Sequence, residues 1–298
     1  MERSFHYKRS PGRVIFLIFA WVFLIFIALV CLMPIWHVVM ASISNPTELN
    51  VTRGLVLKPL KNVDINAYKM ILQYKQLWRG YRNTIMYCLL ACAITGVMTV
   101  IAGYVFSRNR FRYRNTFMMI ISFTMLFNGG MIPTYMVIRK LGMLDTVWAI
   151  VVPGCLNVFN IILMRTSMQG ISDALEEAAR LDGANDFVIM FRIILPLCKA
   201  TFAVIMLFTI VGQWNNYMSA LLYLPSKQNL YPLQMELRKI LYQSTKEITS
   251  ASDVNASSIY ARSVEYAAIV VSTLPILLVY PFVQKYFVTG MTIGAVKA

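Results

Sequence analysis

The chain has 298 residues, of which 58% are hydrophobic and only 14% are charged, and its mean hydropathy is +0.61. This composition excludes an ordinary soluble enzyme, because soluble domains carry about 25% charged residues. The 28 Lys and Arg against 13 Asp and Glu give a formal charge of +15. Apolar runs interrupt these bases throughout, so they indicate membrane orientation rather than a basic face for nucleic acid.

Six stretches are long and apolar enough to cross a bilayer core about 30 Å thick, which takes about 20 helical residues. These predicted spans are residues 14–40, 83–106, 116–138, 144–164, 197–217 and 266–284. Within them only Asp145 and Lys199 are formally charged, each within three positions of a span end. The first span is too long for a signal-peptide core, so we expect a retained helix. The sequence therefore predicts an all-α polytopic membrane protein.

Basic clusters predict the orientation of these spans. Four arginines lie between Arg108 and Arg114, and residues 1–13 form a second basic flank. Both fall on one side of the membrane, which should be the cytoplasm. Arg79 and Arg82, just before the second span, are a contrary signal. We therefore predict that both chain termini are cytoplasmic.

This topology assigns the remaining segments to two sides. Residues 41–82 and 218–265 are predicted to be external, and residues 285–298 form a cytoplasmic tail. Between Tyr68 and Tyr81, helical apolar spacing predicts a helix that either lies at the membrane interface or packs on its own protein. The stretch 244–258, rich in Ser, Thr, Ala and Asn, is predicted to be a flexible surface loop.

A short helix is predicted in the cytoplasmic segment 165–196, between the fourth and fifth spans. Asp173 can serve as its N-cap with Glu176 at the N3 position, and Gly183 can end it in a left-handed conformation. Glu176 and Arg180, four positions apart, add a few tenths of a kcal/mol. Such a helix is too short to cross the membrane.

Three residues of this helix could face a partner. Ala178 and Ala179 would leave a face without bulk, where another protein could approach closely, and Glu177 would offer a hydrogen-bond acceptor. On the helix pattern alone, an ordinary amphipathic loop helix is the favoured alternative. The wider spacing changes this interpretation: Glu177-Ala178-Ala179, three residues, Gly183, nine residues, then Ile193, Leu195 and Pro196.

That spacing resembles the signature loop of permease subunits of binding-protein-dependent ABC importers. Residues 129–135, 141–146, 213–216 and 290–297 extend the resemblance over most of the chain, towards the carbohydrate-type permeases. The chain is similar to the second permease subunit of the maltose importer, and especially to a branch associated with complex oligosaccharides in Gram-positive bacteria.

The resemblance implies the ABC importer type I permease fold: six transmembrane helices and a cytoplasmic coupling helix between spans 4 and 5, in one permease domain of about residues 80–285. The tail residues Gly290, Gly294 and Lys297 would lie near the ATPase. The residues implied to couple to the ATPase are Glu176, Glu177, Ala178, Ala179, Asp182, Gly183, Ile193, Leu195 and Pro196.

The implied partners are a second homologous permease subunit forming a heterodimer, two ATPase subunits, an extracellular solute-binding protein and the lipid of a bacterial cytoplasmic membrane, with no nucleic acid. No glycine is followed by lysine, so the chain has no P-loop. ATP and Mg²⁺ would therefore bind to the partner ATPase. The chain has five cysteines without a CxxC pair and two isolated histidines, so we predict no metal site, no cofactor and no enzyme activity of its own.

Polar side chains at bilayer depth are candidates for a sugar path, because they are costly there unless they face protein or water. The alternative is that each amide makes an interhelical hydrogen bond. Glycines and prolines in the third and sixth spans are predicted to kink or break those helices. The candidate path residues are Asn128, Asn157, Asn160, Gln213, Trp214, Asn215, Asn216 and Tyr217.

The predicted function is the permease subunit of an ATP-driven importer that passes a sugar, with an oligosaccharide expected, from an external binding protein across the membrane. An ion-coupled secondary carrier is the alternative, although no span interior holds the carboxylate that proton coupling normally uses. A membrane-bound enzyme is a third hypothesis. The external segments, with residues 139–145 at the turn between the third and fourth spans included, carry 14 bases against seven acids, which favours acidic oligosaccharides without identifying the sugar.

Overall fold

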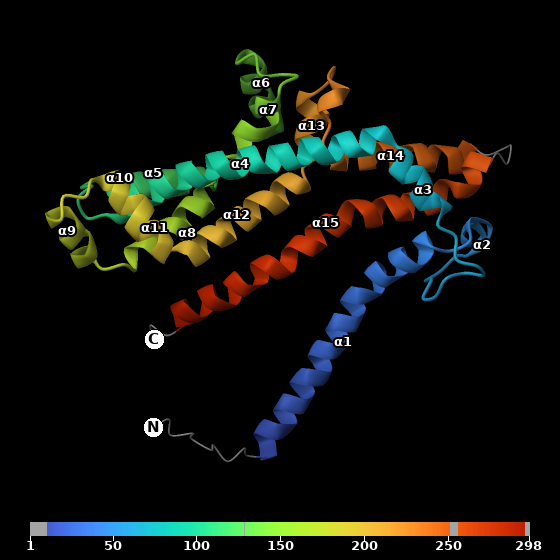
Figure 1. The fold of residues 1–298 in the computed structure, drawn as a ribbon, viewed down its shortest axis with the longest axis horizontal. Helices are drawn as coiled ribbons and strands as arrows, with labels where there is room; N and C mark the ends of the chain where they lie inside the picture. The colour runs from blue at the N-terminus through green and yellow to red at the C-terminus, as the bar shows by residue number, and fades with distance from the viewer. Residues whose placement is uncertain (1–10, 128, 251–255, 296–298) are drawn as a thin grey trace. The chain divides into compact units, whose positions relative to one another are not determined.

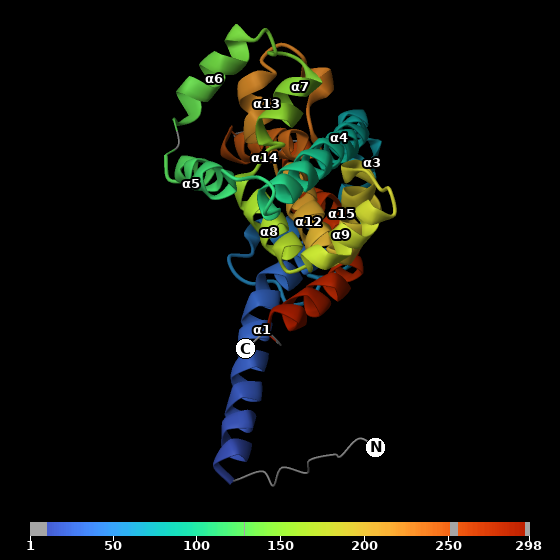
Figure 2. The same cartoon turned by 90° about the vertical axis from the view of Figure 1, so that its left-hand side faces the viewer.

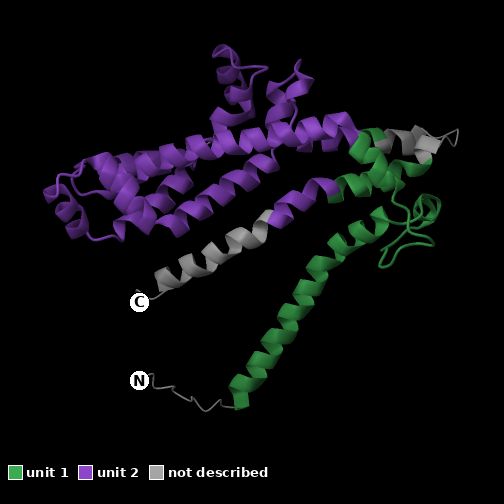
Figure 3. Ribbon diagram, viewed as in Figure 1, with its two compact units in different colours: residues 1–73, 241–270 green, residues 74–240, 271–298 purple. Residues whose placement is uncertain are grey.

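The computed structural model describes residues 11–127, 129–250 and 256–295, and the regular structure in these ranges is helical. The chain forms two compact units (Figure 3). One comprises residues 1–73 and 241–270, and the other comprises residues 74–240 and 271–298. Side chains are described throughout these ranges except for residues 244–250, 256–258 and 279–295.

The first unit contains α1, a 32-residue helix that holds the predicted first span. Most α1 side chains between Val14 and Trp36 are exposed and apolar, as expected for a helix that contacts lipid or another subunit. Its last turn joins a small core in which Ala41, Leu49 and Val56 are buried. The helices that begin in this unit are α1 (Pro11–Ser42), α2 (Pro46–Val51), α3 (Asn66–Gln73) and α15 (Ala256–Ala295).

The core of the first unit is closed by hydrogen bonds between distant segments. The Arg262 guanidinium donates to the Leu49 carbonyl at 2.8 Å, and the Asn50 amide donates to the Ile259 carbonyl at 3.0 Å. These bonds join α2 to the first part of α15. The helix predicted between residues 68 and 81 is present as α3 and the start of α4.

The second unit is organised around α4, a 33-residue helix that runs beside α8 and α12 (Figures 1 and 2). Gly103 allows α4 and α8 to approach closely, since a Cβ at this position would lie 2.6 Å from the Met164 Cγ atom. The helices of this unit are α4 (Lys75–Ser107), α5 (Arg114–Thr124), α6 (Met131–Lys140), α7 (Val147–Val151), α8 (Val158–Gln169), α9 (Asp173–Leu181), α10 (Asp186–Val188), α11 (Leu195–Leu197), α12 (Lys199–Trp214), α13 (Met218–Tyr223) and the start of α14 (Leu233–Ser250).

Two buried clusters hold the second unit together. Near the start of α4, Tyr87 packs with α7 and α13 residues such as Val151 and Tyr223. Near its end, Val100 and Tyr104 pack with Met168 of α8 and Ile189, the first residue of the π-helix Ile189–Ile194. Figure 1 shows α9 and α10 at this second end of α4.

The predicted third span, residues 116–138, is not one helix. It is divided between α5 and α6, with Gly130 between them at φ +88°. Gly130 adopts this left-handed conformation without the steric cost that a Cβ would impose, which confirms the predicted break. In contrast, α15 continues through Pro275 and Pro281, so the sixth span is not broken.

The fourth and fifth spans also depart from straight helices. The fourth is a pair, Val147–Gly154 and Val158–Gln169, bent by 48°. Before the fifth, the segment Asp186–Leu197 meets α12 at 86°. Among the described residues, three helices are long and apolar enough to cross a membrane, or up to five if each bent pair is one span.

The predicted external loop 218–265 is largely helical rather than irregular. It contains α13, all of α14 and the beginning of α15. The stretch 244–258 was predicted to be a flexible loop, which is wrong for 244–250 and 256–258, because these residues continue α14 and begin α15. Polar composition misled the prediction here, because α14 is anchored earlier in its length by the buried Leu233 and Leu237.

Candidate functional site

Helix α9 begins with a different cap from the predicted one. The Ser172 hydroxyl accepts a hydrogen bond from the Ala174 amide at 3.3 Å, so Ser172 is the N-cap and Asp173 is the first helical residue. The prediction of Asp173 as N-cap was wrong because its carboxylate has other partners. One oxygen accepts from Arg108 at 3.2 Å and the other from the Asn109 amide at 2.8 Å.

The end of α9 follows the predicted glycine rule. Gly183 has φ +83°, the left-handed conformation that glycine adopts most easily. Its amide donates to the Arg180 carbonyl at 3.0 Å, and the Ala184 amide donates to the Ala179 carbonyl at 3.0 Å. This pair of bonds is the Schellman motif, and it satisfies carbonyls that the helix end would otherwise leave without donors.

The buried face of α9 is formed by Glu176 and Ala179. One Glu176 oxygen accepts from the Tyr104 hydroxyl at 3.1 Å and from Arg180 at 2.8 Å, which is the predicted four-residue pair. Its other oxygen lies 3.4 Å from Arg108 Nε. Ala179 packs in the cluster at the end of α4. Ala179 is therefore not part of an open face, because the small side chain instead lets α9 sit close to the core.

The exposed face of α9 is both acidic and apolar. Glu177, Ala178 and Asp182 are exposed, and the Leu181 side chain is 90% exposed. On the adjoining α10, Phe187 is 68% exposed. Large apolar side chains exposed to this degree beside carboxylates are typical of a protein-binding surface.

Arginine side chains keep α9 and α10 together. Arg180 forms ion pairs with both Glu176 and Asp186. The hydrogen bond to Glu176, followed by the charge of Asp186, raises the pKa of Arg180 above its usual value despite some desolvation. Through these two ion pairs Arg180 links α9 to Asp186, the first residue of α10.

The three other predicted coupling residues lie where the chain enters α12. Ile193 is half-buried in the π-helix and packs on the cluster at the end of α4. Leu195 and Pro196 form α11 with Leu197, immediately before the 86° bend into α12. They position the loop rather than share its exposed apolar face.

The predicted path residue Asn157 caps helix α8. The Asn157 side chain accepts from the Phe159 and Asn160 amides at 2.9 and 3.4 Å, so Asn157 is the N-cap of α8. Asn160 is buried in the first turn of α8. Asn157 therefore has a local capping role rather than the interhelical hydrogen bond that the alternative interpretation expected.

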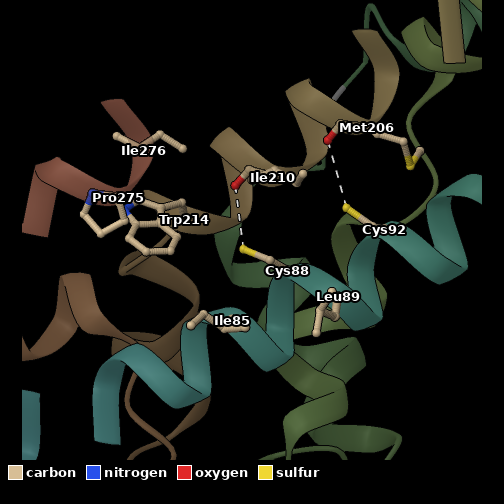
Figure 4. A pocket seen from close by; sticks show the side chains of 9 residues that line it. All are labelled: Ile85, Cys88, Leu89, Cys92, Met206, Ile210, Trp214, Pro275 and Ile276. Atoms are coloured by element: carbon tan, nitrogen blue, oxygen red, sulfur yellow. Dashed lines mark hydrogen bonds between the residues drawn. The ribbon is translucent and has the colours of Figure 1, made fainter. Parts of the chain in front are cut away.

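Trp214 lines a cavity of about 380 Å³ between α4, α12 and α15 (Figure 4). Its indole NH donates to the Ser272 carbonyl at 3.3 Å, next to the Val271 carbonyl that accepts from the Tyr81 hydroxyl. A buried ring facing apolar side chains is a poor platform for a sugar. The cavity is lined by Ile85, Cys88, Leu89, Cys92, Met206, Ile210, Trp214, Pro275 and Ile276.

The end of α12 carries the remaining described candidates. Gln213 is half-buried, and the exposed Asn215 donates to the Val211 carbonyl of its own helix at 2.9 Å. Asn216 bonds Ser219, its amide donating to the hydroxyl at 2.9 Å and its carbonyl accepting from the backbone at 3.1 Å. Tyr217 is exposed, with the Arg238 guanidinium 5.1 Å from its ring centre. An aromatic ring and a positive charge therefore lie side by side at Tyr217 and Arg238.

Four predicted site residues remain: Asn128, Gly290, Gly294 and Lys297. Asn128 and Lys297 lie outside the described residues. Gly290 and Gly294 lie within α15, which continues to Ala295, past the predicted end of the sixth span at residue 284.

Tyr104 and Arg108 were missed as site residues. Arg108 belongs to the arginine cluster that indicated orientation, and a single sequence gives no sign that one of four neighbouring arginines turns inward. Among the described residues, no group of three or more His, Cys, Asp or Glu is placed to hold a metal ion.

Comparison with known proteins identifies related membrane components. A family model described as "Binding-protein-dependent transport system inner membrane component" matches residues 96–293. A polygalacturonan/rhamnogalacturonan transport system permease protein, YtcP of Bacillus subtilis, is 37% identical over 92% of this chain and 96% of its own length. Protein LplC of the same organism is 35% identical over 90% of both chains.

A solved structure extends the likeness to the whole fold. It is a chain of a bacterial ABC transporter involved in the import of the acidic polysaccharide alginate. The two chains are 37% identical with a TM-score of 0.81, and the match covers 93% of this chain and 98% of the other.

Proposed function

The chain belongs to the family of binding-protein-dependent transport system inner membrane components, and from this premise we propose how it couples ATP hydrolysis to the import of an oligosaccharide. It is a mostly helical membrane protein and a permease subunit of an ATP-driven carbohydrate importer. Its relatives do not support an ion-coupled carrier, the alternative left open by the sequence. Permeases of this family are not themselves enzymes.

We infer that α9 and α10 form the coupling helix and its extension. The observation that carries this proposal is the exposed surface of Glu177, Ala178, Leu181 and Phe187, held on a buried ionic base. Leu181 and Phe187 would fill a cleft of a separate ATPase subunit, which binds ATP and Mg²⁺, and Glu177 would accept a hydrogen bond or ion pair at its rim. Closure of two ATPase subunits would then displace α9.

The proposed topology keeps six spans and both termini in the cytoplasm. The bent pair Val147–Gly154 and Val158–Gln169 is the fourth span, α12 is the fifth, and α5 with α6 forms a discontinuous third span. Irregular backbone at membrane depth is tolerated where it faces protein or a water-filled path. A second homologous permease subunit would supply the other wall of that path, and an extracellular binding protein would deliver the sugar.

We propose an acidic oligosaccharide of uronic acids as the cargo. Two observations support this substrate class. The external segments of the proposed topology carry 14 bases against seven acids. The similar proteins include a polygalacturonan/rhamnogalacturonan transport permease and a chain of a transporter that imports the acidic polysaccharide alginate. A positive entrance raises the local concentration of anionic cargo. Tyr217 beneath the Arg238 guanidinium is a suitable contact for a sugar ring that carries a carboxylate.

Leu181→Asp tests the docking surface in the complete transporter. A charge on this 90% exposed side chain should abolish ATPase co-purification and uptake without affecting membrane insertion. Leu141→Asp is a matched control, because Leu141 is 66% exposed at the turn after α6, on the opposite predicted side. Normal ATPase binding by Leu181→Asp would refute docking through α9.

The cargo proposal needs a separate measurement. Proteoliposomes containing the transporter and its binding protein should take up oligogalacturonate but not a neutral oligosaccharide of the same length. Preference for the neutral sugar would refute the acidic substrate class and leave the docking proposal intact.

A further inference from the structure

Arg108 joins three helices at a single point. It is the residue directly after α4, and its Nη2 atom donates to the Met168 carbonyl near the end of α8 at 2.8 Å. Its Nη1 and Nε atoms lie 3.2 Å from Asp173 and 3.4 Å from Glu176, both on α9. One guanidinium therefore connects the end of α4, the end of α8 and the first turn of α9.

The charges around this junction are buried and interconnected. Only 7% of the Arg108 side chain and 11% of the Glu176 side chain are exposed. Tyr104, one turn earlier on α4, donates its hydroxyl to Glu176 and lies with its ring centre 5.6 Å from the Arg108 guanidinium. Such a pair adds little net stability compared with apolar packing, but removing one partner strands the other charge. The physical consequence of the buried Arg108–Glu176 pair is a defined position of α9 relative to the end of α4.

The other arginines of the 108–114 cluster do not occupy this position. Arg110 is 75% exposed at its side chain and reaches Asp186 only at 3.7 Å. Arg112 is exposed and has no ion pair among the described residues. Arg114 donates to the Ser107 carbonyl at 3.3 Å. A charge needed only to orient the membrane helices would be satisfied at any of these positions, whereas Arg108 is turned into the protein.

We propose that Arg108 is a positioning residue that makes α9 and α4 move as one body during the transport cycle. This inference rests on the proposed docking of α9 to an ATPase. A displacement of α9 passes through Asp173 and Glu176 to the guanidinium and from there to the ends of α4 and α8. Because Gly103 brings the α4 backbone against α8, the motion continues into the helices that surround the path.

Arg108→Gln in the complete transporter is the direct test, with Arg112→Gln as the matched control. Arg108→Gln should keep basal ATP hydrolysis but lose about tenfold of its stimulation by binding protein loaded with oligogalacturonate, within the roughly 5- to 150-fold range of coupling between sites. Arg112→Gln removes the same charge from the same cluster and should behave like wild type. Undiminished stimulation in assembled Arg108→Gln would overturn the inference.

A second measurement separates positioning from folding and does not depend on the cargo. Spin labels at Ala178 on α9 and Val105 on α4, both exposed, should report one narrow distance in wild type, unchanged between nucleotide-free and ATP-vanadate states. In Arg108→Lys, which keeps the charge but loses the planar fork, the distance should broaden and change with nucleotide. A narrow, constant distance in Arg108→Lys would overturn the inference.

Tyr104→Phe provides a milder variant if the arginine replacements fail to assemble. It removes only the hydroxyl that donates to Glu176, so it should assemble fully and broaden the same distance to a smaller extent. If the label distance is unchanged in Tyr104→Phe and both Arg108 variants fail to assemble, Arg108 is needed only for folding and the inference is wrong. If wild type binds no ATPase, the proposed function fails instead, and the label distances still report the junction.

Discussion

The first half of α4 is tied to its surroundings by neutral groups, whereas its end is tied by charges. The Asn83 amide donates to the Asn229 and Tyr231 carbonyls at 2.8 and 3.0 Å, and the Tyr87 hydroxyl donates to the Leu230 carbonyl at 2.6 Å. At the other end, Arg108 meets two carboxylates of α9. Both contacts are buried, but their chemistry differs.

The difference suggests two mechanical roles. A side chain that bonds backbone carbonyls fixes one arrangement, since those carbonyls lose their partner if the helix shifts. The Arg108 guanidinium instead contacts two carboxylates of α9 and the Met168 carbonyl of α8 at once, so it holds α9 in a defined geometry at the end of α4. The neutral contact is therefore suited to a permanent attachment, and the ionic contact to a junction that transmits movement.

Removing the neutral attachment should have the largest effect on stability. Asn83→Ala leaves two carbonyls without this donor and should lower the free energy of unfolding by about 2 kcal/mol. Denaturant unfolding of the purified protein in detergent measures this loss. Asn215→Ala, whose exposed amide bonds only its own helix, should change stability by less than about 0.5 kcal/mol. Equal losses in the two variants would contradict the distinction.

A change at the end of α9 should affect the charged end of α4, where α9 packs. Gly183→Ala places a Cβ on a residue with φ +83° and should cost about 1.5 kcal/mol, purely through the backbone, since no atom lies within 4 Å of that Cβ. We expect weaker ATPase binding, measured by co-purification, with the α4 attachment intact. Gly154→Ala, which also has free space but no positive φ, is the control and should bind the ATPase normally.

A tyrosine hydroxyl can be removed near either end of α4, by Tyr87→Phe or by Tyr104→Phe. Tyr87→Phe should lower the free energy of unfolding by about 1 kcal/mol, because the Leu230 carbonyl loses a donor. Stimulation of ATP hydrolysis by the loaded binding protein should not change in this variant. If Tyr87→Phe instead changed this stimulation without changing stability, the junction that transmits movement would lie near the start of α4 and not at Arg108.

The smallest effect is expected at Glu236, which is buried beside Lys239 on α14. Burial raises the pKa of Glu236, and the charges of Lys239 and Arg79 only partly oppose this shift. The folded chain therefore holds this proton more tightly than the unfolded chain. Stability should fall as the pH rises from the usual glutamate pKa through the raised one.

Glu236→Gln removes that titration. The variant should be more stable than wild type at neutral pH by less than about 1 kcal/mol, and the difference should shrink below the usual glutamate pKa. Thermal unfolding at the two pH values measures it. A variant less stable than wild type at neutral pH would mean that the pairing with Lys239 outweighs burial.

Several features of the fold were readable from local sequence because their causes are local. The left-handed Gly183 ends α9 as predicted, and Gly130 breaks the third span. In contrast, the loop predicted over 244–258 is mostly helical, and Asp173 is not the N-cap, because a contact from a distant segment recruits its carboxylate. Local rules fail where tertiary partners compete for the same group.

The candidate site divides in the same way. The resemblance of the 177–196 spacing to a known signature loop singled out Glu177 and Gly183, because that loop is continuous in the chain. It could not distinguish the exposed Ala178 from the buried Ala179, or recognise that Trp214 lies against an apolar cavity. These distinctions depend on which helices pack against each side chain.

By itself, the sequence determined that this is a helical membrane permease, since long uncharged apolar runs have no stable alternative outside a bilayer and the signature loop is contiguous. Only the tertiary structure decided which residues hold that loop. Tyr104 and Arg108 meet Glu176 across about 70 residues of chain. Such a contact exists only after α4, α8 and α9 have packed, so no local pattern could contain it.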